Sequence, residues 1–154
     1  MKIGQTDIIT HIIIIDLDIY PIKTRLYPLA PKESEFLQKE LDHFKNPGII
    51  KKYESPWATP ILFVKKKNSK LYLVVDYHKL NKVTRNDTYS LLRINELLDS
   101  LRNMAVFSIL DMYSGFYQIE VDPESHEKIV FIIKYRIYQY NQLSIGLYNL
   151  LAIF

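Results

Sequence analysis

Apolar residues recur at helical spacing in two stretches of the chain, residues 31–45 and residues 93–102. The apolar positions are Leu37, Leu41 and Phe44 in the first stretch, and Ile94, Leu97, Leu98 and Leu101 in the second. The first stretch opens at Pro31, which suits a first helical position, and Asn46-Pro47-Gly48 stops it. The pattern predicts a core-facing amphipathic helix over residues 31–45 and a second amphipathic helix over about residues 93–102.

Short apolar runs bounded by turn residues predict the strands. The expected strands are residues 61–67, 71–77, 105–110, 116–121, 129–134 and 136–143. The first two form a hairpin through Asn68-Ser69-Lys70, and the last two form a second β pair. The continuous apolar run 105–110 is expected to be buried. Residues 1–30 contain several prolines and are expected to be irregular, and Asp122–Ser125 is a plausible start for one or two helical turns.

Composition places the chain among globular proteins. It has 154 residues, 48% hydrophobic and 24% charged, with a net charge of +3 that is too small to demonstrate a nucleic-acid partner. The absence of cysteine excludes disulfides and thiolate metal sites. The apolar run 12–15 is too short to cross a bilayer, and the start does not resemble a secretion signal. We therefore expect a cytoplasmic chain without a membrane partner.

A single carboxylate, Asp111, stands at the end of the predicted strand 105–110, and a turn containing Gly115 follows it. A carboxylate at a strand end can hold a hard cation such as Mg²⁺, with substrate phosphates completing the coordination shell. The competing interpretation is that an Asp before a turn caps its own backbone. The residues around Asp111 leave both interpretations open.

Four lysines gather at the tip of the first predicted hairpin: Lys65, Lys66, Lys67 and Lys70. One interpretation is a solvated hairpin end that keeps the sheet edge from pairing with other chains. The other is a grip for phosphates, either of a nucleotide or of a nucleic-acid backbone. Aromatic and apolar neighbours flank the cluster, and both interpretations remain open.

Taken in order, several segments resemble the reverse transcriptase domain of gypsy-like retrotransposons and, more distantly, the retroviral enzymes. The matching segments are residues 45–50 with 55–67 (GII…SPWATPILFVKKK), 75–84 (VDYHKLNKVT), 89–98, 107–121, and 138–154, which ends in GLYNLLAIF. Each motif alone is weak, but their shared order and spacing are specific. The resemblance covers about residues 10–154.

This resemblance implies an α+β fold: the fingers and an incomplete palm of a right-hand polymerase, with antiparallel strands and packed helices. It divides the chain into an N-terminal arm (1–30), fingers and the start of the palm (31–104), and a partial palm (105–154) truncated before the Tyr-x-Asp-Asp hairpin. The partners it implies are an RNA or DNA template–primer and a deoxynucleoside triphosphate. The cofactor it implies is Mg²⁺ or Mn²⁺. Intact relatives are particle-associated or nuclear.

The resemblance also assigns roles to single residues. Asp111 matches the first catalytic Asp and metal ligand, and Met112 would lend its backbone carbonyl to a metal. Phe116 matches the steric gate under the sugar, and Lys66 matches the lysine that contacts the triphosphate. The remaining matches place Gly146 beside the nucleotide, Asn149 beside the template, and Lys65, Lys67 and Lys70 along the nucleic acid.

Three departures from the family pattern weaken the expectation of activity. The printed sequence contains no Asp-Asp pair, and one carboxylate cannot position two divalent ions. Tyr72 stands where the family places a phosphate-gripping Arg. Near the C-terminus, Ser144-Ile145 replaces Pro-Phe and Leu150-Leu151 replaces Ala-Pro.

These departures predict a fragment of a retrotransposon polyprotein that does not polymerise alone. One alternative is a non-catalytic nucleic-acid-binding remnant that uses the lysine-rich hairpin. A second alternative is an open reading frame without function.

Overall fold

A five-stranded sheet forms the centre of the computed structural model, which describes residues 4–16, 18–65, 71–86, 94–134 and 136–150. Its strands are β2 (Ile50–Lys52), β3 (Thr59–Lys65), β4 (Leu71–Val75), β6 (Val130–Ile133) and β7 (Arg136–Tyr140). They lie in the order β2-β7-β6-β3-β4. β3 runs parallel to β6, and every other neighbouring pair in this sheet is antiparallel. The mixture of helices and mainly antiparallel strands confirms the predicted α+β class.

Both predicted hairpins are confirmed, and β4, β6 and β7 are shorter than expected. In the first hairpin, Ile61 of β3 lies opposite Val75 of β4. In the second, Ile132 of β6 lies opposite Ile137 of β7. β4 ends at residue 75 rather than 77, and β7 ends at residue 140 rather than 143. Residues 66–70, which join β3 to β4, lie outside the described part of the chain.

The helix α1 (Pro31–Lys45) has the bounds that the sequence predicts. Its N-terminus is stabilised by the Glu33 side chain, which accepts a hydrogen bond of 2.8 Å from the backbone N–H of Ala30. Its predicted apolar face, Leu37, Leu41 and Phe44, is buried. After the helix, Gly48 adopts a positive φ of 78° that favours glycine, and the chain turns there into β2.

The core lies where α1 meets the sheet. Phe131 of β6 is fully buried, and its ring centroid lies 5.7 Å from that of Tyr138 and 5.2 Å from that of Tyr140. Ile49 and Ile129 are also fully buried. Aromatic rings in such arrangements contribute packing energy in addition to the area that they bury.

The N-terminal residues are more regular than predicted. β1 (Thr6–His11) pairs in parallel with β5 (Ile119–Val121), so the expectation of an irregular residue 1–30 segment is wrong for β1. The backbone N–H of Ile13 donates to the buried Ser125 hydroxyl at 2.9 Å. Ser125 belongs to η2, a 3-10 helix over Pro123–Lys128, which confirms the predicted helical turns. Partners far along the chain therefore hold the N-terminal segment in place.

A helix stands at residues 78–83, where the apolar pattern predicts no element. α2 (His78–Val83) has little apolar periodicity, which is why the pattern does not reveal it. Leu80 is buried on the core side of α2. The helix is held by this tertiary contact rather than by an amphipathic face of its own.

The predicted buried strand 105–110 is wrong. Residues 101–113 are exposed and form neither helix nor strand, and the side chains of Ile109 and Leu110 are each 93% exposed. The predicted strand 116–121 is also corrected, because its first half is a 3-10 helix, η1 (Gly115–Gln118), and only β5 is extended. An apolar run forms a buried strand only where a neighbour pairs with it and covers it, and within the described residues nothing does so here.

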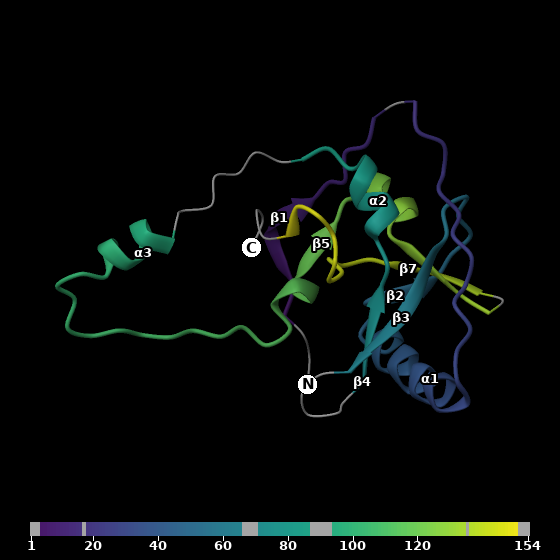
Figure 1. Cartoon of the computed structure of the whole chain (residues 1–154), viewed down its shortest axis with the longest axis horizontal. Coiled ribbons are helices and arrows are strands. Elements are labelled where there is room, and N and C mark those ends of the chain that lie inside the picture. Colours follow the sequence, from purple (N-terminus) through teal and green to yellow (C-terminus); the bar gives the residue numbers. More distant parts are fainter. Residues whose placement is uncertain (1–3, 17, 66–70, 87–93, 135, 151–154) are drawn as a thin grey trace.

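The second predicted helix is confirmed as α3 (Ile94–Ser100), but none of its residues is buried. Figure 1 shows α3 and the chain after it projecting from the rest of the molecule. By contrast, the apolar C-terminal stretch is buried at Leu147 and Leu150. Among the described helices, none has the length and apolarity needed to cross a membrane.

Candidate functional site

Asp111 lies on the projecting segment, exposed to solvent. Its carboxylate forms no hydrogen bond with the described residues. The structure therefore does not support the interpretation that Asp111 caps its own backbone. The described residues also contain no group of three or more His, Cys, Asp or Glu side chains that could hold a metal ion. Met112 is 53% exposed on the same segment. The described chain therefore presents one isolated carboxylate where the sequence predicted a metal ligand.

Phe116 stands close to Asp111 in sequence but in a different environment. It lies on η1, partly buried against the hydrophobic core. The turn before it includes Ser114 in a left-handed conformation with φ of 51°. The Gln118 side chain donates to the Tyr113 carbonyl at 3.0 Å and closes this turn. The ring of Phe116 thus has a fixed support, whereas the carboxylate of Asp111 does not.

The lysine-rich hairpin is described only in part. Lys65 ends β3 and lies opposite Leu71 of β4, and its side chain is exposed. Lys66, Lys67 and Lys70 lie outside the described residues. The antiparallel register places Lys65 and Leu71 together at one end of the β3–β4 hairpin.

The predicted nucleotide-side residue Gly146 is locked against the end of β4. The Asn81 side chain of α2 donates to the Gly146 carbonyl at 2.7 Å. Gly146 has φ of 103°, and an added Cβ would lie 3.5 Å from the Val75 carbonyl oxygen. The Asn149 side chain donates to the Arg85 carbonyl at 3.0 Å. These two bonds bring together two motif segments that the sequence separates by more than sixty positions.

A buried phenol supports the same junction. Tyr77, between β4 and α2, is 1% exposed, and burial raises the pKa of its hydroxyl, which also hydrogen-bonds to Ser144. Tyr77 therefore remains neutral and anchors the loop that leads to Gly146.

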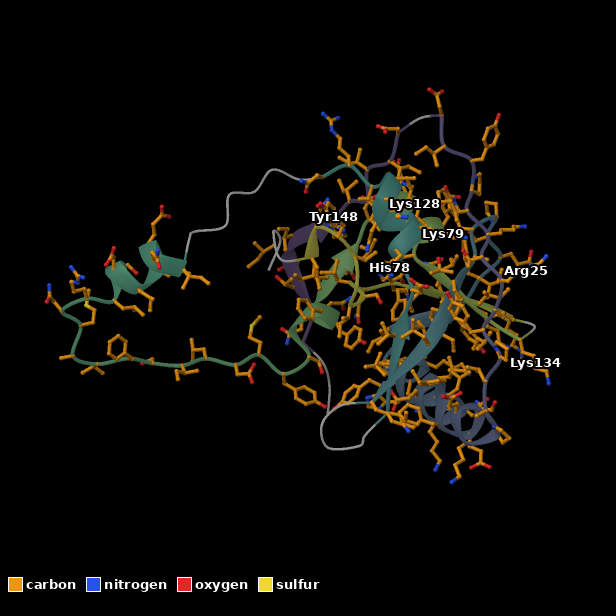
Figure 2. All side chains as sticks on the ribbon, viewed as in Figure 1. Arg25, His78, Lys79, Lys128, Lys134 and Tyr148 are labelled. Carbon is orange, nitrogen blue, oxygen red and sulfur yellow. The ribbon has the colours of Figure 1, made fainter. Side chains whose placement is uncertain are left out.

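Asp76 is the polar centre of this region, although neither the sequence pattern nor the family resemblance assigns it a role. Its carboxylate accepts hydrogen bonds from the Tyr27 hydroxyl at 3.0 Å and, with the imidazole as donor, from His78 Nδ1 at 2.7 Å. Burial opposes ionisation of Asp76, but the hydrogen bonds from His78 and Tyr27 outweigh it, so the pKa of Asp76 lies below its usual value. Figure 2 labels His78 and Lys79, which belong to α2. Tyr27 comes from the N-terminal arm, so no local motif could reveal the contact.

Asp76→Asn is expected to lower the free energy of unfolding by about 1–2 kcal/mol near neutral pH, the scale of hydrogen bonds to a charged acceptor. Because the pKa of Asp76 is lower in the folded chain, the carboxylate stabilises it above the unfolded pKa, and this stabilisation is lost as the pH falls through the folded pKa. Urea unfolding of the parent chain and the Asp76→Asn variant should be measured near neutral pH and at about pH 3. The difference between their free energies of unfolding should be smaller in acid. The exposed Asp18→Asn control should unfold with the same free energy as the parent chain. A difference between Asp76→Asn and the parent chain that does not change with pH would contradict the stabilising role of the Asp76 carboxylate.

Gly146→Ala is expected to destabilise the fold by about 1–2 kcal/mol, because an L-residue at this positive φ is strained. Gly4→Ala is the matched control, since Gly4 has no positive φ and an added Cβ would meet only the flexible Gln118 side chain. Chemical denaturation of the three proteins measures both changes. Equal stability of the Gly146→Ala variant and the parent chain would show that this loop is not held as described.

Comparison with known proteins places the chain in context. The sequence model of the family described as "Reverse transcriptase (RNA-dependent DNA polymerase)" matches residues 64–154. Two retrovirus-related Pol polyproteins of Drosophila melanogaster are similar. That of transposon 297 is 34% identical over 87% of this chain and 13% of its own length. That of transposon gypsy is 32% identical over 90% of this chain and 14% of its own length.

Solved structures show the same architecture. The prototype foamy virus protease–reverse transcriptase CSH mutant matches 99% of this chain and 20% of its own, with a TM-score of 0.86 and 25% identity. A foamy viral protease–reverse transcriptase in complex with an RNA/DNA hybrid matches with a TM-score of 0.80 and 22% identity, over 98% of this chain and 20% of its own. The chain thus spans about a seventh of the polyproteins and a fifth of these solved chains.

Proposed function

This chain belongs to the reverse transcriptase family and is similar to a fragment of retrotransposon Pol polyproteins, including that of gypsy; from that premise we propose that it binds template–primer as part of an RNA-directed DNA polymerase. The observation that carries the proposal is the junction at Gly146. Side-chain hydrogen bonds of Asn81 and Asn149 connect the β4–α2 segment with the C-terminal loop there. Both of these segments carry the family pattern.

The proposed roles follow the family pattern at single positions. Lys66 contacts the triphosphate, Gly146 lies beside the nucleotide, and Phe116 lies under its sugar. Lys65, Lys67, Lys70 and Asn149 bind the template–primer backbone. The fixed ring of Phe116 and the exposed side chain of Lys65 support this assignment.

Family membership implies dependence on a divalent metal in general, and we propose Asp111 and the Met112 carbonyl as ligands for Mg²⁺ or Mn²⁺. The described residues do not fit a two-metal centre, because Asp111 is isolated and no further group of carboxylates lies near it. No catalytic step is therefore assigned to this chain alone. The same proposal includes the division of the chain into arm, fingers and partial palm. It also includes a location in the cytoplasm or in a particle.

The test is binding of a fluorescein-labelled RNA/DNA hybrid to the 154-residue chain, measured by anisotropy over a series of KCl concentrations. Phosphate contacts release counterions, so log K should fall linearly with log salt. No binding, or an affinity that does not change with salt, would overturn the proposal.

Primer extension with Mg²⁺ separates the polymerase proposal from its non-catalytic alternative. The isolated position of Asp111 favours a chain that binds the hybrid without extending it. Extension by these 154 residues, lost in Asp111→Asn, would show that they complete a metal centre after all.

A further inference from the structure

A cavity of about 680 Å³ lies beside α1 and the central sheet. Three parts of the chain form its walls: the N-terminal arm, α1 and the central sheet. The apolar wall residues are Leu26 and Leu29 of the arm, Leu37 and Leu41 of α1, and Ile61 and Ile133 of the sheet. A volume of this size, with walls that are mainly aliphatic, is typical of sites for small organic ligands.

The rim of the cavity is positively charged. Lys134 and Arg136 line it at the tip of the β6–β7 hairpin, and none of its described lining residues is acidic. Figure 2 shows Lys134 at the outer edge of the molecule, far from Tyr148, which follows Gly146. The positively charged rim of the cavity therefore lies apart from Tyr148 and the C-terminal loop.

Three neutral polar groups of the lining already have partners inside the protein. The Tyr27 hydroxyl donates to Asp76, the Ser34 hydroxyl donates to the Ala30 carbonyl, and the Gln38 amide donates to Asp42. The exposed guanidinium of Arg136, in contrast, forms no ion pair within the described chain. The features left to bind a ligand are thus the apolar interior of the cavity and the Arg136 guanidinium at its mouth.

We propose that this cavity binds an amphipathic organic acid, with its hydrocarbon part among the leucines and its carboxylate at Arg136 and Lys134. A guanidinium is the side chain best suited to a carboxylate, because it can donate two parallel hydrogen bonds. A nucleotide fits less well, since its ribose hydroxyls would lose water against aliphatic walls without gaining partners. This inference does not depend on the proposed function.

Titration of the 154-residue chain with decanoate, followed by ¹H–¹⁵N NMR spectra, tests the proposal by location. Saturable shifts are expected at the amides of Leu37, Leu41 and Arg136. The amides of Leu98 and Leu110, on the projecting apolar segment, should not shift. Shifts confined to the projecting segment, or no saturation, would overturn the proposal.

Two variants and a control complete the test. Arg136→Gln should weaken decanoate binding by roughly tenfold through loss of the charged hydrogen bonds. Gln38→Trp should prevent binding by filling the mouth without changing the charge. Arg102→Gln removes the same charge from the projecting segment, where Arg102 pairs with Asp99 at 3.6 Å, and should leave the affinity unchanged. Equal effects of Arg136→Gln and Arg102→Gln would refute a specific site, whether or not the Trp variant folds.

Discussion

Phe131→Ala is expected to cost about 3–5 kcal/mol of folding free energy, a large share of the stability of a domain of this size. The side chain is fully buried, and its ring packs on Tyr138 and Tyr140, so truncation leaves a cavity between β6 and β7. Urea unfolding can be followed by the fluorescence of Trp57, which is 3% exposed in the folded chain. The transition should move to much lower urea, or the variant should be unfolded before urea is added.

Phe107→Ala is the matched control. Phe107 lies on the projecting segment and is 59% exposed, so the same truncation should change stability by about 0.5 kcal/mol or less. The pair tests both the position of the core and the exposure of residues 101–113. A loss at Phe107 comparable to that at Phe131 would show that the projecting segment is buried in solution.

Simultaneous replacement of Lys65, Lys66 and Lys67 by alanine is expected to weaken RNA/DNA hybrid binding roughly 10- to 100-fold. Each lysine that contacts a phosphate releases counterions, so the slope of log K against log salt should become shallower by about two to three. Anisotropy measured over several KCl concentrations gives both quantities. The loss should be the same for different hybrid sequences, because phosphate contacts do not read bases.

Lys23, Lys32 and Lys39, all exposed, provide a control triple with the same change in charge. Their replacement by alanine should alter the affinity far less, because the proposal places the phosphates at the β3–β4 hairpin. If the two triples weaken binding equally, the attraction is a property of net charge and the hairpin has no special role.

The elements that the sequence predicts well are those with local signals. α1 has caps and a helical apolar face, and each hairpin is two short runs joined by a few residues. β1 has no such signal. β5 lies within the predicted strand 116–121, but its parallel pairing with the distant β1 leaves no local mark on either strand. The run 105–110 fails for a different reason: its composition indicates burial but does not specify what would cover it.

The candidate site likewise contains some residues that the sequence predicts and others that it does not. Gly146 and Asn149 stand in a segment that the family pattern marks, and the structure adds their contacts with Asn81 and Arg85. The Tyr27–Asp76 bond joins residues 49 positions apart and could not be predicted from either neighbourhood. The role of Asp111 stays a prediction, because its local sequence fits both a metal ligand and a backbone cap. The described residues contain no group of three or more His, Cys, Asp or Glu side chains that could hold a metal ion.

The pairing of β1 with β5 has a consequence during synthesis on the ribosome. Gln5, just before β1, hydrogen-bonds to Glu120, which is 115 positions later. At typical elongation rates of about 5–20 residues per second, the isoleucine-rich N-terminus emerges several seconds before its partner strand exists. During that interval it is an unpaired apolar edge, which is a natural target for chaperones and for association between neighbouring nascent chains.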